Sequence, residues 1–226
     1  MSWKTHDGKV AVVTGAGRGI GRAIAAGLAR RGAHVIVVDK DDPADTIEGI
    51  RAEGGAADPY IADVSDEDQV TELADTVAGI HGGADILVNN AGIYPFVPID
   101  DLDYATWRKV LAVNLDAQFL LAKALLSQLR RSKYGRIVNL ISNSIGPAVP
   151  HLTHYMASKN GVIGFTRASA NDVAADGITV NAVGPTLSLP PVSSPPSPTS
   201  SSPTCRTPRH SRNPARPPTW SAPCCF

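Results

Sequence analysis

The segment YMASK places Tyr155 and Lys159 four residues apart, so a helix would present both side chains on one face, one turn apart. A phenol serves as an acid or base near neutral pH when a nearby ammonium group favours its phenolate form. Ser142 lies 13 residues before Tyr155, and Asn114 lies in a VNL segment between two predicted helices. Tyr-x-x-x-Lys alone is common and usually structural, but with these two partners it indicates proton transfer to a substrate oxygen.

A glycine-rich segment, TGAGRGIG (14–21), separates a predicted strand from a predicted helix. Glycines there permit a sharp turn and bring the helix N-terminus close to a pyrophosphate, whose charge the free backbone N–H groups and the helix dipole favour. Such turns also occur without a ligand, so the segment favours a nucleotide without requiring one.

Asp39 ends the second predicted strand. A carboxylate there can accept hydrogen bonds from both hydroxyls of an adenosine ribose and would repel a 2′-phosphate, which predicts NAD as the cofactor and makes NADP less favoured. Arg18 and Lys40 lie nearby in the sequence and would instead attract a phosphate. The plain alternative is a solvated carboxylate at a strand end.

Strands and helices alternate along the part of the chain that carries these residues. Short Val- and Ile-rich runs bounded by glycine are typical of strands covered on both faces. Apolar residues four apart, such as Ile20 and Ile24, indicate a helix, and Ser65 with Asp68 indicates a capping-box helix start. The predicted strands are 9–15, 33–39, 57–64, 85–92, 135–142 and 178–183, and the later predicted helices are 65–81, 103–114, 117–133 and 155–175.

Repeated β-α-β units predict an α/β fold, a doubly wound parallel sheet with helices on both faces. Such a sheet binds ligands at the carboxyl ends of its strands, near the point where the strand order reverses.

With these residues assembled, the chain resembles the short-chain dehydrogenase/reductase family over nearly all of residues 1–185, which implies a Rossmann-type sheet. The resemblance implies a catalytic tetrad of Asn114, Ser142, Tyr155 and Lys159. It also implies that the cofactor contacts Gly15, Arg18, Gly19, Ile20, Gly21, Asp39, Asp63, Val64, Asn90, Ala91, Gly92, Tyr155, Lys159 and Pro185.

The resemblance further implies hydride exchange between a carbinol carbon and the nicotinamide ring. Tyr155 would exchange the proton with the substrate oxygen, which Ser142 would hold. Lys159 would bind the nicotinamide ribose, and Asn114 would hold a water that links Lys159 to solvent. The segments NAGIYP and GVIGFTRA are most similar to members that oxidise aryl or cyclic secondary alcohols, although pyridoxal-oxidising relatives share some of them. Candidate pocket residues are Ile93, Tyr94, Asn143, His151 and His154.

Composition divides the chain into residues 1–186, a predicted nucleotide-binding domain, and residues 187–226. The last 40 residues hold 11 of the 18 prolines and four arginines, with no Asp, Glu, Lys or Gly. Such a segment cannot bury enough apolar surface to offset chain entropy, which predicts a disordered tail. Its three cysteines match neither a disulfide framework nor the spacing of a zinc site, so no metal is predicted.

The remaining features predict a cytoplasmic protein whose partner is a small-molecule alcohol or ketone. The net charge is zero, the N-terminus lacks a secretory pattern, and no run approaches the roughly 18 apolar residues that span a bilayer. Neither a nucleic acid nor a membrane is predicted as a partner.

The tail replaces the family's lid segment and seventh strand. Regrouping the degenerate codons of SLPPV and of the ending PTWSAPCCF one base earlier allows VTTPG and DLVGAVLF, which resemble the family again. A one-base frame shift near Leu187 is therefore predicted, and the frame-corrected chain is expected to form a homo-oligomer. The alternative is a non-catalytic NAD-binding or interaction protein that displays a genuine Pro-rich ligand.

Overall fold

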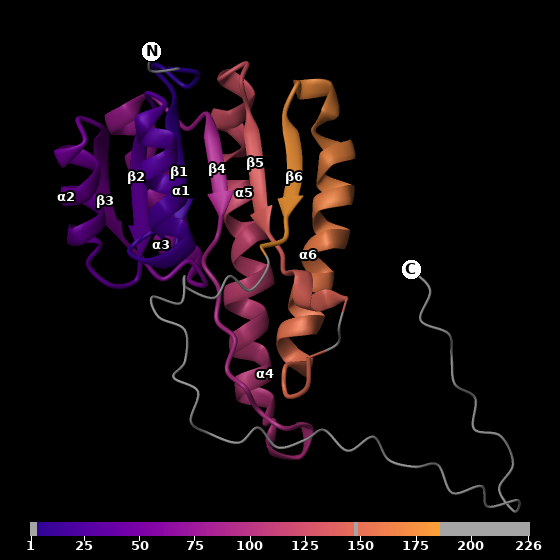
Figure 1. Ribbon diagram of the computed structural model, residues 1–226. Coiled ribbons are helices and arrows are strands. Elements are labelled where there is room, and N and C mark those ends of the chain that lie inside the picture. Colours follow the sequence, from indigo (N-terminus) through magenta and orange to yellow (C-terminus); the bar gives the residue numbers. More distant parts are fainter. Residues whose placement is uncertain (1–3, 147–148, 186–226) are drawn as a thin grey trace, which may run out of the picture. The chain divides into compact units, whose positions relative to one another are not determined.

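The computed structural model describes residues 4–146 and 149–185, which form a parallel sheet in the order β3-β2-β1-β4-β5-β6 (Figure 1). The strands are β1 (Val10–Thr14), β2 (His34–Asp39), β3 (Ala56–Ile61), β4 (Ile86–Asn89), β5 (Arg136–Leu140) and β6 (Thr179–Val183). All pairings between them are parallel, so the predicted α/β fold is confirmed. The strand order reverses between β1 and β4, which places the expected ligand site at their carboxyl ends.

Helices connect the strands and run antiparallel to them. They are α1 (Gly19–Arg30), α2 (Ala44–Ala52), α3 (Glu67–His81), α4 (Tyr104–Leu111), α5 (Ala117–Arg131) and α6 (Thr153–Asp172), with 3₁₀ turns at Ile99–Asp101, Asn143–Ile145 and Ala174–Asp176. The sequence analysis did not predict α2, a short helix whose buried side chains are Thr46, Ile47 and Ile50.

Successive strand residues face opposite layers, because side chains along a strand alternate between the two sides of a sheet. Val12 and Leu87 pack in one core with α3 and α5, whereas Val13 and Val88 pack in a second core with α1 and α2. Figure 1 shows α6 running alongside β6. The two cores hold the sheet rigid, so its carboxyl edge can carry side chains at fixed positions.

The helix through Asn114 differs from the prediction. Residues Ala112–Asp116 form a π-helical turn that joins α4 to α5 without a break, so the expected gap between residues 114 and 117 is wrong. The continuous helix Tyr104–Arg131 is long and apolar enough to cross a membrane by length and composition alone. Its inner side chains Leu121 and Leu125 belong to the core between α3 and the sheet, as expected for a core helix.

The start of α3 also differs from the prediction by one residue. Asp66 is the N-cap, and its carboxylate accepts hydrogen bonds from the backbone N–H groups of Asp68 and Gln69 at 3.0 and 3.1 Å. The predicted cap, Ser65, instead donates its hydroxyl to Asp63 at 2.6 Å. Both residue types cap helices well, so the sequence pattern did not separate them.

The predicted tail, residues 187–226, and the predicted frame shift near Leu187 lie outside the described residues. The predicted division into two parts therefore stays a prediction.

Candidate active site

Thr14 and Asn90 join the ends of β1 and β4 at the switch point. The buried Thr14 hydroxyl donates to the carbonyl of Val88 and accepts from the backbone N–H groups of Asn90 and Ala91, both at 3.1 Å. The amide of Asn90 donates to the carbonyls of Thr14 and Gly15 at 2.9 and 3.0 Å. These bonds fix the glycine-rich turn against the loop that follows β4.

Gly15 and Gly21 are required by close packing in this turn. A Cβ atom on Gly15, whose φ is +61°, would lie 2.8 Å from Cα of Ala91. A Cβ atom on Gly21 would overlap the carbonyl oxygen of Gly15 and lie 2.6 Å from the Asn90 amide nitrogen. Side chains at these positions would push α1 away from β1 and disturb the anion-binding geometry of the turn.

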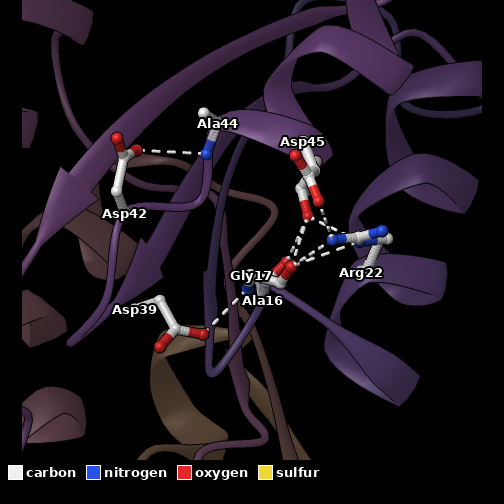
Figure 2. A network of polar contacts seen from close by, with 8 residues as sticks. Ala16, Gly17, Arg22, Asp39, Asp42, Ala44 and Asp45 are labelled. Carbon is white, nitrogen blue, oxygen red and sulfur yellow. Dashed lines mark hydrogen bonds and ion pairs between the residues drawn. The ribbon is translucent and has the colours of Figure 1, made fainter.

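Asp39 points back from the end of β2 into the glycine-rich turn (Figure 2). Its Oδ2 accepts a 2.8 Å hydrogen bond from the backbone N–H of Gly17, and a Cβ atom on Gly17 would lie only 2.9 Å from that oxygen. Among the residues that the structure describes, the other oxygen, Oδ1, receives only a long 3.4 Å bond from the N–H of Asp41. Asp39 therefore shapes the turn with one oxygen and offers the other to a ligand.

Arg22 and Thr46 hold the same turn through hydrogen bonds, a contribution that the sequence analysis missed. The Arg22 guanidinium donates to the carbonyl of Gly17 at 2.7 Å and to the Thr46 hydroxyl at 2.9 Å. Thr46 in turn donates to the carbonyls of Ala16 and Gly17, at 3.0 and 2.9 Å respectively. Figure 2 shows Arg22 and Asp45 on the side of the turn opposite Asp39. The missed helix α2 thus positions part of the candidate cofactor site.

Asp63 and Val64 follow β3 at the same edge of the sheet. The Asp63 carboxylate accepts from the N–H and the hydroxyl of Ser65, and its own N–H donates to Gln69 at 2.9 Å. The side chain of Val64 is buried in the core. Val64 can therefore present only its main chain to an adenine ring, whereas Asp63 is exposed.

Lys159 lies buried beneath Tyr155 on α6. Its Nζ atom is 5.8 Å from the centre of the Tyr155 ring and donates a 2.6 Å hydrogen bond to the carbonyl of Leu140, at the end of β5. Burial lowers the pKa of Lys159 from 10.5 to about 8, because it disfavours the charged form. The predicted pair on one helix face is present, with its ammonium group anchored to the sheet.

Asn114 lies in the π-helical turn, and its side chain is close to Gly92, as is that of Lys159. Its amide forms a two-way clamp with Ile93, accepting from the Ile93 N–H at 2.8 Å and donating to the Ile93 carbonyl at 2.9 Å. A Cβ atom on Gly92 would lie 3.3 Å from Asn114 Oδ1 and 3.7 Å from Lys159 Nζ. The loop after β4 is thus held between Asn114 and Lys159, close to both.

In the π-helical turn, the Asn114 carbonyl accepts a 3.1 Å hydrogen bond from the side-chain amide of Gln118.

Ser142 lies two residues beyond β5 and caps the 3₁₀ turn that follows. Its hydroxyl is 2.8 Å from the hydroxyl of Ser144, which donates to the sulfur of Met156 at 3.7 Å. Because Met156 follows Tyr155 in α6, this chain of contacts ties the Ser142 turn to the helix that carries the tyrosine. Ser144 is a further site residue that the sequence analysis missed.

Pro185 reaches the same region from the end of β6. Its carbonyl accepts from the N–H of Asn143 at 3.4 Å, one residue after Ser142. Pro185 and the tetrad residues thus come from separate segments and meet at the carboxyl edge of the sheet.

Of the five candidate pocket residues, Ile93 is bound to Asn114 and Tyr94 lies against the ring of Tyr155. The exposed Tyr94 ring meets the Tyr155 ring edge-on, with 6.0 Å between the ring centres. His151 is exposed, with its backbone in the left-handed region. His154 is fully buried, and neither ring nitrogen has a hydrogen-bond partner among the described residues. His154 is therefore a packing residue rather than a wall of an open pocket.

The start of α1 fits a nucleotide diphosphate. Arg18 precedes the helix in extended conformation, and its side chain makes no capping hydrogen bond. A Cβ atom on Gly19 would meet no heavy atom of the described part of the chain within 4 Å, so those residues leave space beside the first turn. Ile20 is half exposed there and offers an apolar surface. The free N–H groups favour an anion, and Asp39 lies close enough in the fold to receive the attached ribose.

Comparison with known proteins agrees with this arrangement. Residues 9–197 match the short chain dehydrogenase family, which extends the match past the predicted boundary at residue 186. The chain is 42% identical over 181 residues to the cis-4-hydroxycyclohexanecarboxylate dehydrogenase of Sinomonas cyclohexanicum, covering 78% of this chain and 72% of that protein.

Solved structures with similar folds carry either nicotinamide cofactor. A metagenomic short-chain oxidoreductase in complex with NADP aligns with a TM-score of 0.76 and 37% identity, over 80% of this chain and 83% of that one. An NAD⁺-bound xylitol dehydrogenase aligns with a TM-score of 0.75 and 35% identity, over 80% of this chain and 71% of that one. Matching sequence, fold and cofactor edge together show that the chain belongs to the short-chain dehydrogenase/reductase family of nicotinamide-dependent oxidoreductases.

Proposed function

We propose that this protein is an NAD-dependent dehydrogenase that interconverts a secondary alcohol and its ketone, with Tyr155 exchanging the substrate proton. The observation that carries this proposal is the buried Lys159 ammonium group, which the Leu140 carbonyl holds 5.8 Å from the centre of the Tyr155 ring. A fixed positive charge beside a phenol stabilises its phenolate form.

Tyr155 and Ser142 act on the substrate oxygen. In oxidation the Tyr155 hydroxyl oxygen accepts the proton of the alcohol, and in reduction it returns a proton to the ketone oxygen. Ser142 holds that oxygen by donating its hydroxyl, and the Ser144 hydroxyl at 2.8 Å then donates to Ser142 in place of the Met156 sulfur.

Lys159 and Asn114 complete the path of the proton. Lys159 binds the nicotinamide ribose and keeps its charge close to Tyr155. Asn114 holds a water that links Lys159 to solvent. The Asn114 clamp on Ile93 fixes the loop that carries Gly92 beside the ammonium group.

The glycine-rich turn and Asp39 would hold the cofactor. The free start of α1 binds the diphosphate, and Oδ1 of Asp39 accepts from the adenosine ribose and repels a 2′-phosphate. The nicotinamide cofactor, when bound, supplies the two-electron acceptor or donor for the reaction. The Gly17 hydrogen bond holds the Asp39 carboxylate in place, which supports the preference for NAD over NADP.

The substrate is an aryl or cyclic secondary alcohol. The exposed Tyr94 ring, edge-on to Tyr155, offers an apolar aromatic surface at the point of proton exchange. A relative that shares 42% of the aligned residues is named for a cyclic secondary alcohol, which supports the same class.

A scan of alcohols with NAD⁺ tests the proposal on both the recorded and the frame-corrected chain. We expect NADH formation from aryl and cyclic secondary alcohols, and much less from the primary alcohols with the same ring. Tight NADH binding by both chains without turnover of any secondary alcohol would contradict the proposal and favour a non-catalytic NAD-binding protein.

A further inference from the structure

Two histidines and one aspartate meet at the edge of the sheet opposite the tetrad. His34 is the first residue of β2, Asp58 lies in β3, and His81 is the last residue of α3. One donor atom from each side chain lies within 4.8 Å of the other two. The three residues are far apart in the sequence and belong to no motif, so only the fold brings them together.

The sheet register explains why these side chains converge. Asp58 pairs with Ile36, and Ile36 faces the core between the sheet and α3. His34 lies two residues before Ile36 in the same strand and faces the same side. His81 lies one helical turn after Val77, which packs into that core, so α3 directs His81 onto the same patch of the sheet.

Both imidazole rings direct Nε2 at one carboxylate oxygen. The distances to Asp58 Oδ2 are 2.8 Å from His34 and 3.7 Å from His81, and the ring centres are 4.6 Å apart. The guanidinium group of Arg51 lies 3.2 Å from the other oxygen, Oδ1. Oδ2 therefore faces the two imidazoles, while the Arg51 cation competes for the negative charge of the same carboxylate through Oδ1.

We propose that His34, Asp58 and His81 bind a divalent transition metal ion of the zinc type. Two imidazole nitrogens and one carboxylate oxygen are ligands that zinc accepts in tetrahedral sites with one open position. Bonds of about 2.0–2.2 Å separate tetrahedral donor atoms by about 3.4 Å, so side-chain shifts of roughly 1 Å close the site. The ion replaces the proton that His34 and Asp58 share, and a water fills the fourth position.

The burial of the three ligands suits a site that solvent can reach. His81 is largely buried, with 12% of its side chain exposed, whereas His34 and Asp58 are exposed to 35% and 43%. A bound ion would fasten the starts of β2 and β3 to the end of α3. Because the site lies at the amino edge of the sheet, metal binding is independent of the proposed reaction at the carboxyl edge.

Zinc binding to the full, metal-stripped chain tests the proposal. Calorimetry should show one ion per chain, and free zinc at about 100 times Kd should raise the midpoint of thermal unfolding by roughly 5–10 °C. His34→Asn, His81→Gln and Asp58→Asn should each weaken zinc binding at least tenfold. The matched control His6→Asn, which alters a histidine outside the cluster, should leave Kd unchanged.

Two further measurements distinguish zinc binding at this cluster from loss of binding through misfolding and from zinc binding by the cysteines near the C-terminus. Arg51→Gln removes a competing positive charge and should tighten zinc binding severalfold, a gain that misfolding cannot produce. Bound Co²⁺ should lack the near-ultraviolet absorption of cobalt thiolate, which Cys205, Cys224 or Cys225 would cause. Absence of stoichiometric zinc binding, or binding unaffected by both His34→Asn and His81→Gln, would overturn the proposal.

Discussion

The ammonium nitrogen of Lys159 lies 2.6 Å from the carbonyl oxygen of Leu140, so the last residue of β5 anchors a charge inside α6. Lys159 is 4% exposed, and burial lowers its pKa to about 8. The same burial that places a positive charge beside Tyr155 makes folding sensitive to alkaline pH.

We expect this lysine to make the protein more stable as the pH rises from about 8 to about 10.5. Over that range the folded chain has lost a proton from Lys159 that the unfolded chain still holds. The unfolded state then binds more protons, so the free energy of unfolding rises with pH, by up to about 3 kcal/mol from this group. Urea unfolding at a series of pH values should show a flatter profile for Lys159→Met, and identical profiles would contradict the burial of the charge.

Asp39 should set the choice of cofactor through its charge. Asp39→Asn keeps an oxygen that can accept from Gly17, whereas Asp39→Ala removes that hydrogen bond as well. We expect the unmodified protein to bind NADH more tightly than NADPH, and Asp39→Asn to narrow the difference about tenfold or more. Fluorescence titration of both cofactors measures this. If the unmodified protein bound NADPH more tightly than NADH, the prediction would be wrong, and Arg18 and Lys40 would be indicated as ligands of the 2′-phosphate.

Gly21→Ala should damage the turn that receives the cofactor. Its new Cβ would overlap the Gly15 carbonyl and press on Asn90, so we expect a lower midpoint of thermal unfolding and weaker NADH binding. Gly27→Ala in the same helix is the matched control, because its Cβ would meet only the end of Arg30 at 3.9 Å. That variant should gain about 0.5–1 kcal/mol of stability from the helix preference of alanine. If both substitutions changed the midpoint of thermal unfolding and the NADH affinity equally, close packing at Gly21 would not be what the turn requires.

The prediction about the tail concerns the gene. Resequencing should reveal a one-base discrepancy near the Leu187 and Ser188 codons, because one regrouping restores family-like sequence at both ends of the tail. Among the described residues β6 pairs only with β5, and its Val183 is half exposed, which is where a restored strand would pair. A confirmed gene sequence, together with efficient turnover by the recorded chain, would make the Pro-rich segment a genuine feature.

Much of the fold was predictable because buried parallel strands have an unmistakable composition. Runs such as VAVVT and HVIVVD are apolar along their whole length, and the segments between them are long enough for crossover helices. Helix α2 was missed because it spans only nine residues, and its only large buried apolar side chains are Ile47 and Ile50. The π-helical turn at Ala112–Asp116 was not visible because the Asn114 clamp on Ile93, a tertiary contact, accompanies it.

The candidate site likewise has features that the sequence indicates and features that only the structure shows. Tyr155, Lys159 and the glycine turn have fixed spacings within one segment, so the sequence indicates them directly. The hydrogen bond from Lys159 to the Leu140 carbonyl could not be predicted, because every residue has a main-chain carbonyl. Likewise, the contact between Gly17 and Asp39 depends on how β1 and β2 pair. Whatever depends on the packing of distant segments, including the histidine and aspartate cluster, required the structure.

The most direct test of the proposed chemistry compares cofactor binding and turnover in Tyr155→Phe, using the frame-corrected chain. The substitution removes only the hydroxyl group and keeps the ring that packs against Tyr94. We predict NADH binding close to that of the unmodified enzyme, with kcat for a secondary alcohol reduced about 10²–10⁴-fold. Full turnover by Tyr155→Phe at neutral pH would contradict the assignment of Tyr155 as the group that exchanges the substrate proton.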